Sequence, residues 1–230
     1  MTELLRHFED FVRSQNGKIV DYSQDKKDRF ICSIFPIGSS LQPGDVLTGG
    51  LAVRVEDESL QLHAYFLRQI CTNGMVRALQ TQAATFTVGQ LYEFQAYLPT
   101  CIEQFREVDF RGNVEQLRFS LFQEVDESKL RRIAYQVASP PANKNSPPQL
   151  FPLVGEEMTR PQPTPRPIRG PHPRLFDVVN GVTALARDTA DPAVRWELMR
   201  LGGELLNSAT PSGPAEKPQY YRKEAATQPA

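Results

Sequence analysis

Short alternating runs of apolar and polar residues dominate the first third of the chain and predict β-strands. The runs cover residues 19–22, 29–35, 46–55, 60–71 and 76–86. Asn73-Gly74 has the composition of a two-residue hairpin turn, because both residues tolerate positive φ. Strands joined by such short connections pair antiparallel, so we expect a meander of about five strands.

Apolar residues at helical spacing predict six helical segments around the sheet. The stripes are Leu4, Leu5, Phe8, Phe11 and Val12; Leu91, Phe94, Leu98, Ile102 and Phe105; Val114, Leu117, Leu121, Phe122 and Val125; Leu130, Ile133, Ala134 and Val137; Leu175, Val178, Val179, Val182, Leu185 and Ala186; and Val194, Leu198, Leu201 and Leu205. We expect Thr2 and Asn113 to cap the first and third helices and Asp191-Pro192 to start the last. Asn16-Gly17 should end the first helix, and Pro99 should kink the second. A sheet followed by helices predicts the α+β class.

Proline divides the chain, since eleven of the 19 prolines lie between Ala138 and Arg174. Proline fixes φ and removes a hydrogen-bond donor, so this stretch cannot be helix interior or central strand. We therefore expect an α+β core domain over 1–137, an extended proline-rich linker over 138–173, and a helix pair over 174–206 that packs back on the core. The remaining 207–230 are expected to form a disordered tail.

Composition narrows the classes of function. The formal charge of -1 and 40% hydrophobic residues exclude a generally basic nucleic-acid coat, and no apolar run suits a membrane protein. Three cysteines are too few for a disulfide framework, and the acidic first residues lack a signal-peptide pattern. We expect a cytoplasmic protein.

Catalytic and cofactor signatures are absent from the sequence. None of the common nucleotide, hydrolase, zinc or redox motifs occurs, and the three histidines and three cysteines form no local ligand pair. His63 and Cys71 share one side of a predicted strand, but eight residues separate them by about 26 Å. We expect no enzymatic activity, cofactor or metal, because a reactive Cys71 would need a partner from a distant part of the chain.

Arg68 interrupts the apolar row that follows one side of the strand at 60–71. A charge on a core-facing row must be paired or reach an opening. Two interpretations stay open: Arg68 pairs with a core acid or lies at a solvated end, or it contacts an anion beside the next turn. In the second case Thr72, Asn73 and Gly74 would complete a small anion-binding concavity.

A polar row on the helix after the linker offers a second candidate. Asn180, Thr183 and Arg187 follow at i, i+3 and i+7. The amphipathic rule favours a solvated face, and the alternative is a polar seam that faces the sheet near Asn73 or Arg68. Trp196 is better explained by packing between the final helices than by stacking on a base.

Two segments resemble a known family. The stretch 63–76 contains Arg68-Gln69-Ile70-Cys71-Thr72-Asn73-Gly74-Met75, and 175–187 contains Asn180-Gly181-Val182-Thr183. Both are similar, in the same order, to the Arg-x-x-Cys-Thr-Asn-Gly-Met stretch and the later Asn-x-x-Thr helix of the uncharacterised phage/plasmid-like protein domain family. The resemblance implies a mobile-genetic-element lineage and no established activity; the acidic residues 56–58 and the long proline-rich linker depart from the family pattern.

Together these observations favour a non-enzymatic module that acts on nucleic acid in replication, recombination or element maintenance, with DNA or RNA as the partner. The candidate residues for binding nucleic acid or another anion are Arg68, Thr72, Asn73, Gly74, Arg77, Asn180, Thr183 and Arg187. The alternative is a protein-interaction or scaffold module that uses the proline-rich linker and oligomerises through the helical stripe from Leu91 to Phe105. The oligomeric state stays open.

Overall fold

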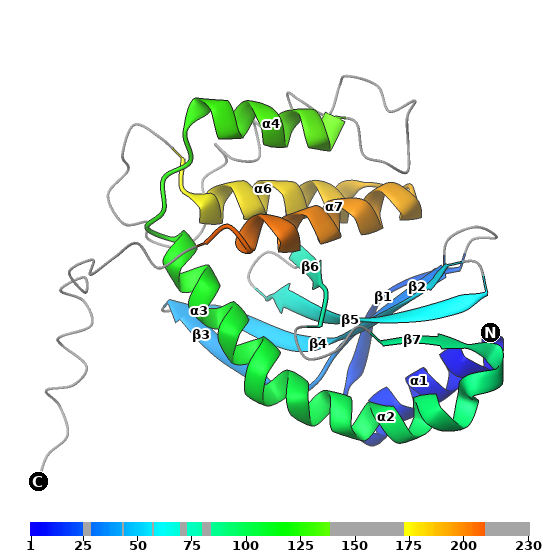
Figure 1. Cartoon of the computed structure of the whole chain (residues 1–230). Helices are drawn as coiled ribbons and strands as arrows, with labels where there is room; N and C mark the ends of the chain where they lie inside the picture. Colours follow the sequence, from blue (N-terminus) through cyan, green and yellow to red (C-terminus); the bar gives the residue numbers. More distant parts are fainter. Residues whose placement is uncertain are drawn as a thin grey trace, which may run out of the picture.

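The computed structural model describes residues 1–24, 29–42, 44–56, 58–69, 73–79, 84–138 and 173–209, and within them seven strands form one antiparallel sheet (Figure 1). The strands are β1 (Lys18–Gln24), β2 (Arg29–Ile34), β3 (Gly38–Gln42), β4 (Asp45–Glu56), β5 (Ser59–Arg68), β6 (Asn73–Arg77) and β7 (Ala84–Thr87). With the helices around it, the sheet confirms the predicted α+β class.

The strand order β1-β2-β4-β5-β6 follows the chain, as a meander requires, and two further strands join it. β3 pairs with the start of β4, and β7 pairs with the start of β5. The run at 76–86, expected as one strand, therefore belongs to two. β3 escaped prediction because the glycine and serines at 38–40 show no apolar alternation.

The N-terminal helix α1 (Thr2–Ser14) buries Leu4, Phe8 and Val12, as its stripe predicted. Thr2 lies inside this helix rather than capping it, because Met1 holds the N-cap position. Asn16 adopts a left-handed φ of 55° beyond the last turn, so Asn16-Gly17 ends the helix as expected.

A long curved helix crosses the lower face of the sheet in Figure 1. A 3₁₀ turn, η1 (Val88–Gln90), leads into α2 (Leu91–Gln104), which contains Pro99, then a π-helical segment, η2 (Phe105–Phe110), and α3 (Arg111–Ser120). The prediction of an Asn113 cap is wrong, because the preceding residues are already helical and Asn113 is buried within α3.

The apolar stripe of α2 is buried in the core. Phe94, Leu98, Ile102 and Phe105 are all at most 2% exposed. Phe105 lies 5.6 Å, centroid to centroid, from Phe66 of β5. These side chains are buried inside the fold. They are therefore not available as the oligomerisation face of the alternative hypothesis.

The C-terminal helices α6 (Leu175–Asp188) and α7 (Pro192–Leu206) fold back over the other face of the sheet, as predicted, and α4 (Glu127–Ala138) lies outside them (Figure 1). His63 and Phe66 of β5 point to opposite faces of the sheet, and His63 contacts Trp196 of α7. Asp191 caps α7 by accepting a hydrogen bond from the Ala193 N–H at 2.9 Å. The core thus comprises helix, sheet and helix layers.

The proline-rich linker and the tail were predicted for 138–173 and 207–230. Most of both segments, 139–172 and 210–230, lies outside the described residues.

Candidate functional site

Arg68, at the end of β5, forms an internal ion pair with Asp45 at the start of β4. Its Nε lies 2.8 Å from both carboxylate oxygens, and its Nη2 lies 2.7 Å from Oδ2. The two side chains are only 5% and 0% exposed, and the guanidinium also lies 4.8 Å from the ring centre of Phe176 in α6. The interpretation that Arg68 pairs with a core acid is confirmed, so the charge of this arginine is compensated inside the fold.

Asn73 and Gly74 are strand residues, so the predicted hairpin turn at this position is wrong. Asn73 pairs with Arg68 and Gly74 pairs with Leu67 in the β5–β6 ladder. Gly74 is required for a different reason: a Cβ there would approach the Tyr65 hydroxyl oxygen to 2.3 Å. Thr72 lies outside the described residues.

The polar row of α6 faces the sheet, which was the alternative to a solvated face. Asn73 Nδ2 donates to the Asn180 carbonyl at 3.2 Å, and Arg187 Nη1 donates to Asn73 Oδ1 at 3.4 Å. Thr183 is buried and donates to the Val179 carbonyl at 2.9 Å. The structure thus brings Asn73, Asn180, Thr183 and Arg187 together, and Arg187 also pairs with Asp188 at the surface.

Arg77, the last residue of β6, connects the sheet to two helices. It donates at 2.5 Å to Asn113 Oδ1 and to Gln116 Oε1 of α3, and it also donates to Asn207 Oδ1 just beyond α7. Burial lowers the pKa of Arg77, while the charge of Asp109 acts in the opposite direction. We call the contacts of Asn73, Arg77, Asn180 and Arg187 the β6 junction.

Two glycines of α7 complete this junction, and sequence reasoning missed them. A Cβ on Gly203 would lie 2.1 Å from the Val76 carbonyl oxygen, and one on Gly202 would lie 2.5 Å from Thr183 Cγ2. Only glycine lets the helix approach both β6 and α6 so closely. α7 consequently packs directly against β6, the last strand in the order of the sheet.

A second charged cluster joins α7 to β4 and β1. Glu197 accepts from Arg54 at 2.9 Å and from Arg200 at 2.9 Å, and Arg195 lies 3.4 Å from Asp21. Trp196 is 1% exposed and packs between Phe30 and His63. The prediction that Trp196 is a packing residue is confirmed, but its ring packs on β2 and β5 of the sheet and not between the final helices. No sequence pattern indicates the cluster, because its members lie on separate elements.

The described cysteines and histidines show no arrangement for nucleophilic or metal chemistry. Burial raises the pKa of Cys32 well above its usual range and that of Cys101 to about 12, so both remain thiols. Cys71 lies outside the described residues. No group of three His, Cys, Asp or Glu side chains within the described ranges could hold a metal ion.

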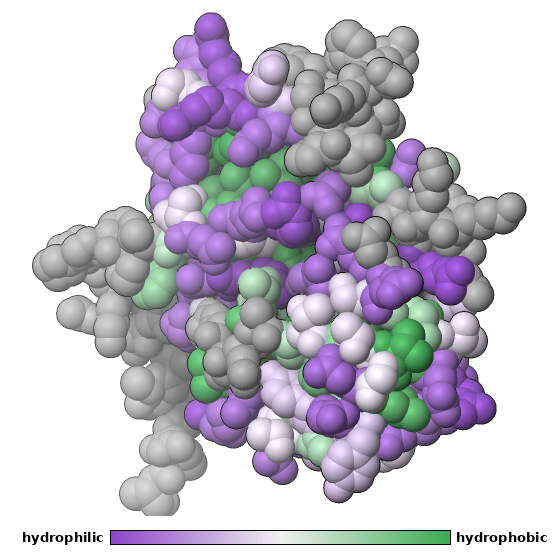
Figure 2. Space-filling view, turned by 45° about the vertical axis from the view of Figure 1, so that its right-hand side comes forward, coloured by the Kyte–Doolittle hydropathy of each residue, from purple (hydrophilic) through white to green (hydrophobic). Residues whose placement is uncertain are grey.

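α4 is the most basic helix in the described part of the chain, and Arg131 and Arg132 lie on its outer face, whereas Lys129 is half-buried and donates to Ser208. α4 carries Lys129, Arg131 and Arg132 against Glu127, a net charge of +2, whereas no other described helix exceeds +1. Arg131 and Arg132 are exposed, and Tyr135 is 73% exposed beside them. Hydrophilic side chains accordingly cover the top of the molecule, where α4 lies (Figure 2).

The inner face of α4 explains why its polar face points outward. Ile133 and Val137 are buried, and Asp126 caps the helix by accepting from the Lys129 N–H at 2.8 Å. Hydrogen bonds from Lys129 and Ser128 lower the pKa of Asp126, and the charge of Arg132 acts in the same direction, so the acidic charge of Asp126 is held at the helix N-terminus. The second half of α4 therefore presents cations and an aromatic ring together.

Comparisons of the chain with known protein families, with curated proteins and with solved structures find no match. None of the helices in the described ranges is both long and apolar enough to cross a membrane.

Proposed function

We propose that this chain is a nucleic-acid-binding module without enzymatic activity, and that it contacts its partner through the outer face of α4. The observation that carries the proposal is the exposure of Arg131, Arg132 and Tyr135 on one stretch of the most basic described helix. Guanidinium groups bind phosphates, and an exposed ring stacks on bases.

The β6 junction contributes to this function indirectly. Arg68 is paired with Asp45, and Arg77 is bound by three amide oxygens, so neither is presented to a phosphate. Of the arginines that the sequence nominates, Arg187 lies nearest the surface, but Asp188 lies 2.7 Å from its Nε. The residues expected to bind an anion thus hold the C-terminal helices in place, and these helices support α4 (Figure 1).

The resemblance to the phage/plasmid-like family supports a role in replication, recombination or maintenance of a mobile element. The near-neutral net charge of -1 limits the binding surface to a local patch, which is what α4 offers. A protein partner for the proline-rich segment remains the alternative, and it gains no support from α2, whose stripe is buried.

The test is fluorescence anisotropy with labelled single-stranded and double-stranded oligonucleotides at about 50 and 200 mM salt. The double variant Arg131→Gln/Arg132→Gln should bind at least about tenfold more weakly, and its salt dependence should fall by about two counterions.

Arg111→Gln is the matched control. Arg111 pairs with Glu107 as Arg131 pairs with Glu127, at i and i+4, and the two arginine side chains are 72% and 76% exposed. The control should bind like the unmodified protein. Equal weakening by Arg111→Gln, or no binding by the unmodified protein at the lower salt, would contradict the proposal.

A further inference from the structure

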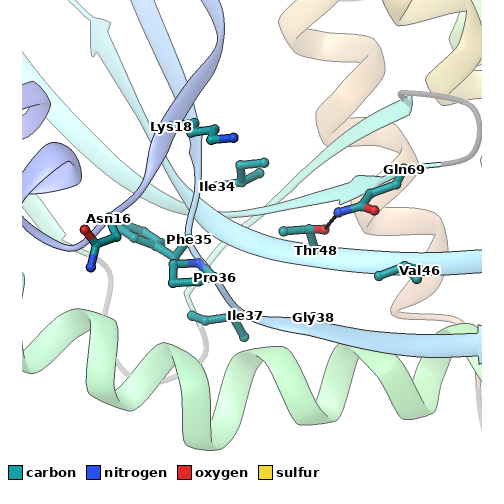
Figure 3. A pocket seen from close by; sticks show the side chains of 10 residues that line it. All are labelled: Asn16, Lys18, Ile34, Phe35, Pro36, Ile37, Gly38, Val46, Thr48 and Gln69. Atoms are coloured by element: carbon teal, nitrogen blue, oxygen red, sulfur yellow. Dashed lines mark hydrogen bonds between the residues drawn. The ribbon is translucent and has the colours of Figure 1, made fainter.

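A cavity of about 290 Å³ opens between the turn after α1, the β2–β3 connection, β4 and the end of β5 (Figure 3). It involves no residue of α4 or of the β6 junction. Its volume lies just below the range of about 300–1,000 Å³ that is usual for small-molecule sites. A ligand that fits it must therefore be small.

The polar part of the cavity lining is rich in hydrogen-bond donors. It consists of Asn16, Lys18, Thr48 and Gln69, and none of the described residues that line the cavity is acidic. Gln69 Nε2 donates to Thr48 Oγ1 at 2.7 Å, which leaves the Thr48 hydroxyl proton to be donated elsewhere (Figure 3). The lining offers an ammonium group, a hydroxyl and two amides and includes no carboxylate among these residues, which favours an anionic ligand group.

The apolar part of the lining is firmly built. It consists of Ile34, Phe35, Pro36, Ile37 and Val46, which alternate with the polar side chains around the cavity (Figure 3). The Phe35 N–H donates to the Gly49 carbonyl at 2.9 Å, and the Gly49 N–H donates to the Ile37 carbonyl at 2.9 Å. These bonds fasten the β2–β3 connection to the sheet on both sides of Pro36, so the cavity does not need to form upon binding. Preformed sites lose less free energy to ordering when they bind.

From this mixed lining we propose a binding site for a small organic carboxylate with a short aliphatic body. Lys18 and the Thr48 hydroxyl bind the carboxylate, and Ile34, Ile37 and Val46 cover the aliphatic chain. The site is independent of the nucleic-acid proposal, because the two share no residue. Aliphatic burial strengthens binding for each methylene that fits, and the cavity sets the upper limit of chain length.

The site can be tested by heteronuclear NMR on the full chain with butyrate and hexanoate as probes, and sodium chloride at matched ionic strength as the reference. We expect saturable shifts of the backbone amide signals of Gly38, Thr48 and Gln69, with hexanoate binding more tightly than butyrate. Butyramide, which has the same size without the charge, should bind at least tenfold more weakly than butyrate.

Two variants separate a built site from general salt effects. Lys18→Met removes the ammonium from an exposed position, and Thr48→Val removes the hydroxyl while keeping the side-chain shape. Each should weaken butyrate binding at least tenfold, whereas Lys129→Met, a lysine change on α4, should leave it unchanged. Equal binding of butyramide, retained binding in Lys18→Met, or no saturable shift up to about 50 mM butyrate would overturn the proposal.

Discussion

Acidification should destabilise the fold through His63, which lies on β5 beneath α7. Its ring packs edge-on against Trp196 with the ring centroids 5.2 Å apart, and its buried Nε2 has no hydrogen-bond partner within the described structure. Burial, with the charges of Arg54 and Arg200, lowers the pKa of His63 from 6.5 to about 4, although Glu197 acts in the opposite direction. The folded state therefore favours the neutral ring.

The magnitude follows from the difference between the folded and unfolded pKa values. Because the folded value is the lower one, this contribution to stability is fully present above pH 6.5 and is lost as the pH falls toward 4. With about 1.4 kcal/mol for each pKa unit, the loss is roughly 1 kcal/mol at pH 5.5 and about 2–3 kcal/mol at pH 4.5. Such a loss is a large fraction of the stability of an ordinary domain.

The assay is urea unfolding of the unmodified protein and of His63→Phe at pH 7.5, 5.5 and 4.5. Phenylalanine keeps a ring against Trp196 and cannot be protonated. Carboxylates titrate in both proteins, so their effect cancels in the difference between the two free energies of unfolding. That difference should shift by about 2–3 kcal/mol in favour of His63→Phe between pH 7.5 and pH 4.5. A difference that stays constant with pH would refute the reasoning.

Three further predictions concern packing, pairing and stacking. Gly203→Ala should destabilise the fold by about 2 kcal/mol or more, because its Cβ would lie 2.1 Å from the Val76 carbonyl oxygen, whereas Gly89→Ala, with open space around it, should change the melting temperature little. Arg68→Met should lower the free energy of unfolding in urea by about 3–5 kcal/mol, because it leaves Asp45 buried without its ion pair. The double variant Asp45→Leu/Arg68→Met should recover most of that loss. No recovery would mean that loss of the ion pair does not cause the destabilisation. In anisotropy titrations, Tyr135→Ala should weaken binding to single strands about fivefold and leave duplex binding unchanged, because the bases of a duplex are already stacked. The control Tyr92→Ala changes a tyrosine that is 80% exposed, and it should alter neither kind of binding.

Local patterns along the chain predicted most of the fold. Alternation located β1, β2, β4 and β5, and the helical stripes located α1, α2, α4, α6 and α7 within a few residues. The errors arose where a local rule met a tertiary constraint. Asn73-Gly74 fits the composition of a turn, but Gly74 is needed under Tyr65, and both residues pair with β5. Asn113 is a residue type that often caps helices, but here the π-helical segment leads directly into α3, so Asn113 lies inside a continuous helix.

The candidate site follows from the sequence less directly than the fold does, because its partners are distant along the chain. Arg68 stands out as a charge on an apolar row, but its partner Asp45 lies 23 residues away and is brought near by the pairing of Leu47 with Arg68. Asn73 meets Asn180 across 107 residues. Spacing along one element predicts which residues share a face, and it does not predict which element that face will meet.

A cluster of arginine, asparagine and threonine residues is ambiguous in a sequence because buried junctions and anion sites need the same donors. In this fold the donors bind acceptors inside the protein. Arg68 pairs with Asp45, Arg77 donates to amide oxygens, and Asn73 donates to a helix carbonyl. Polar contacts of this kind set the orientation of α6 and α7 on β6, where apolar packing alone would allow sliding. Binding to a partner must then depend on cations that the fold does not use. Arg131 and Arg132 on the outer face of α4 meet that condition best, since the i, i+4 pair of Arg131 with Glu127 is exposed and contributes little to stability.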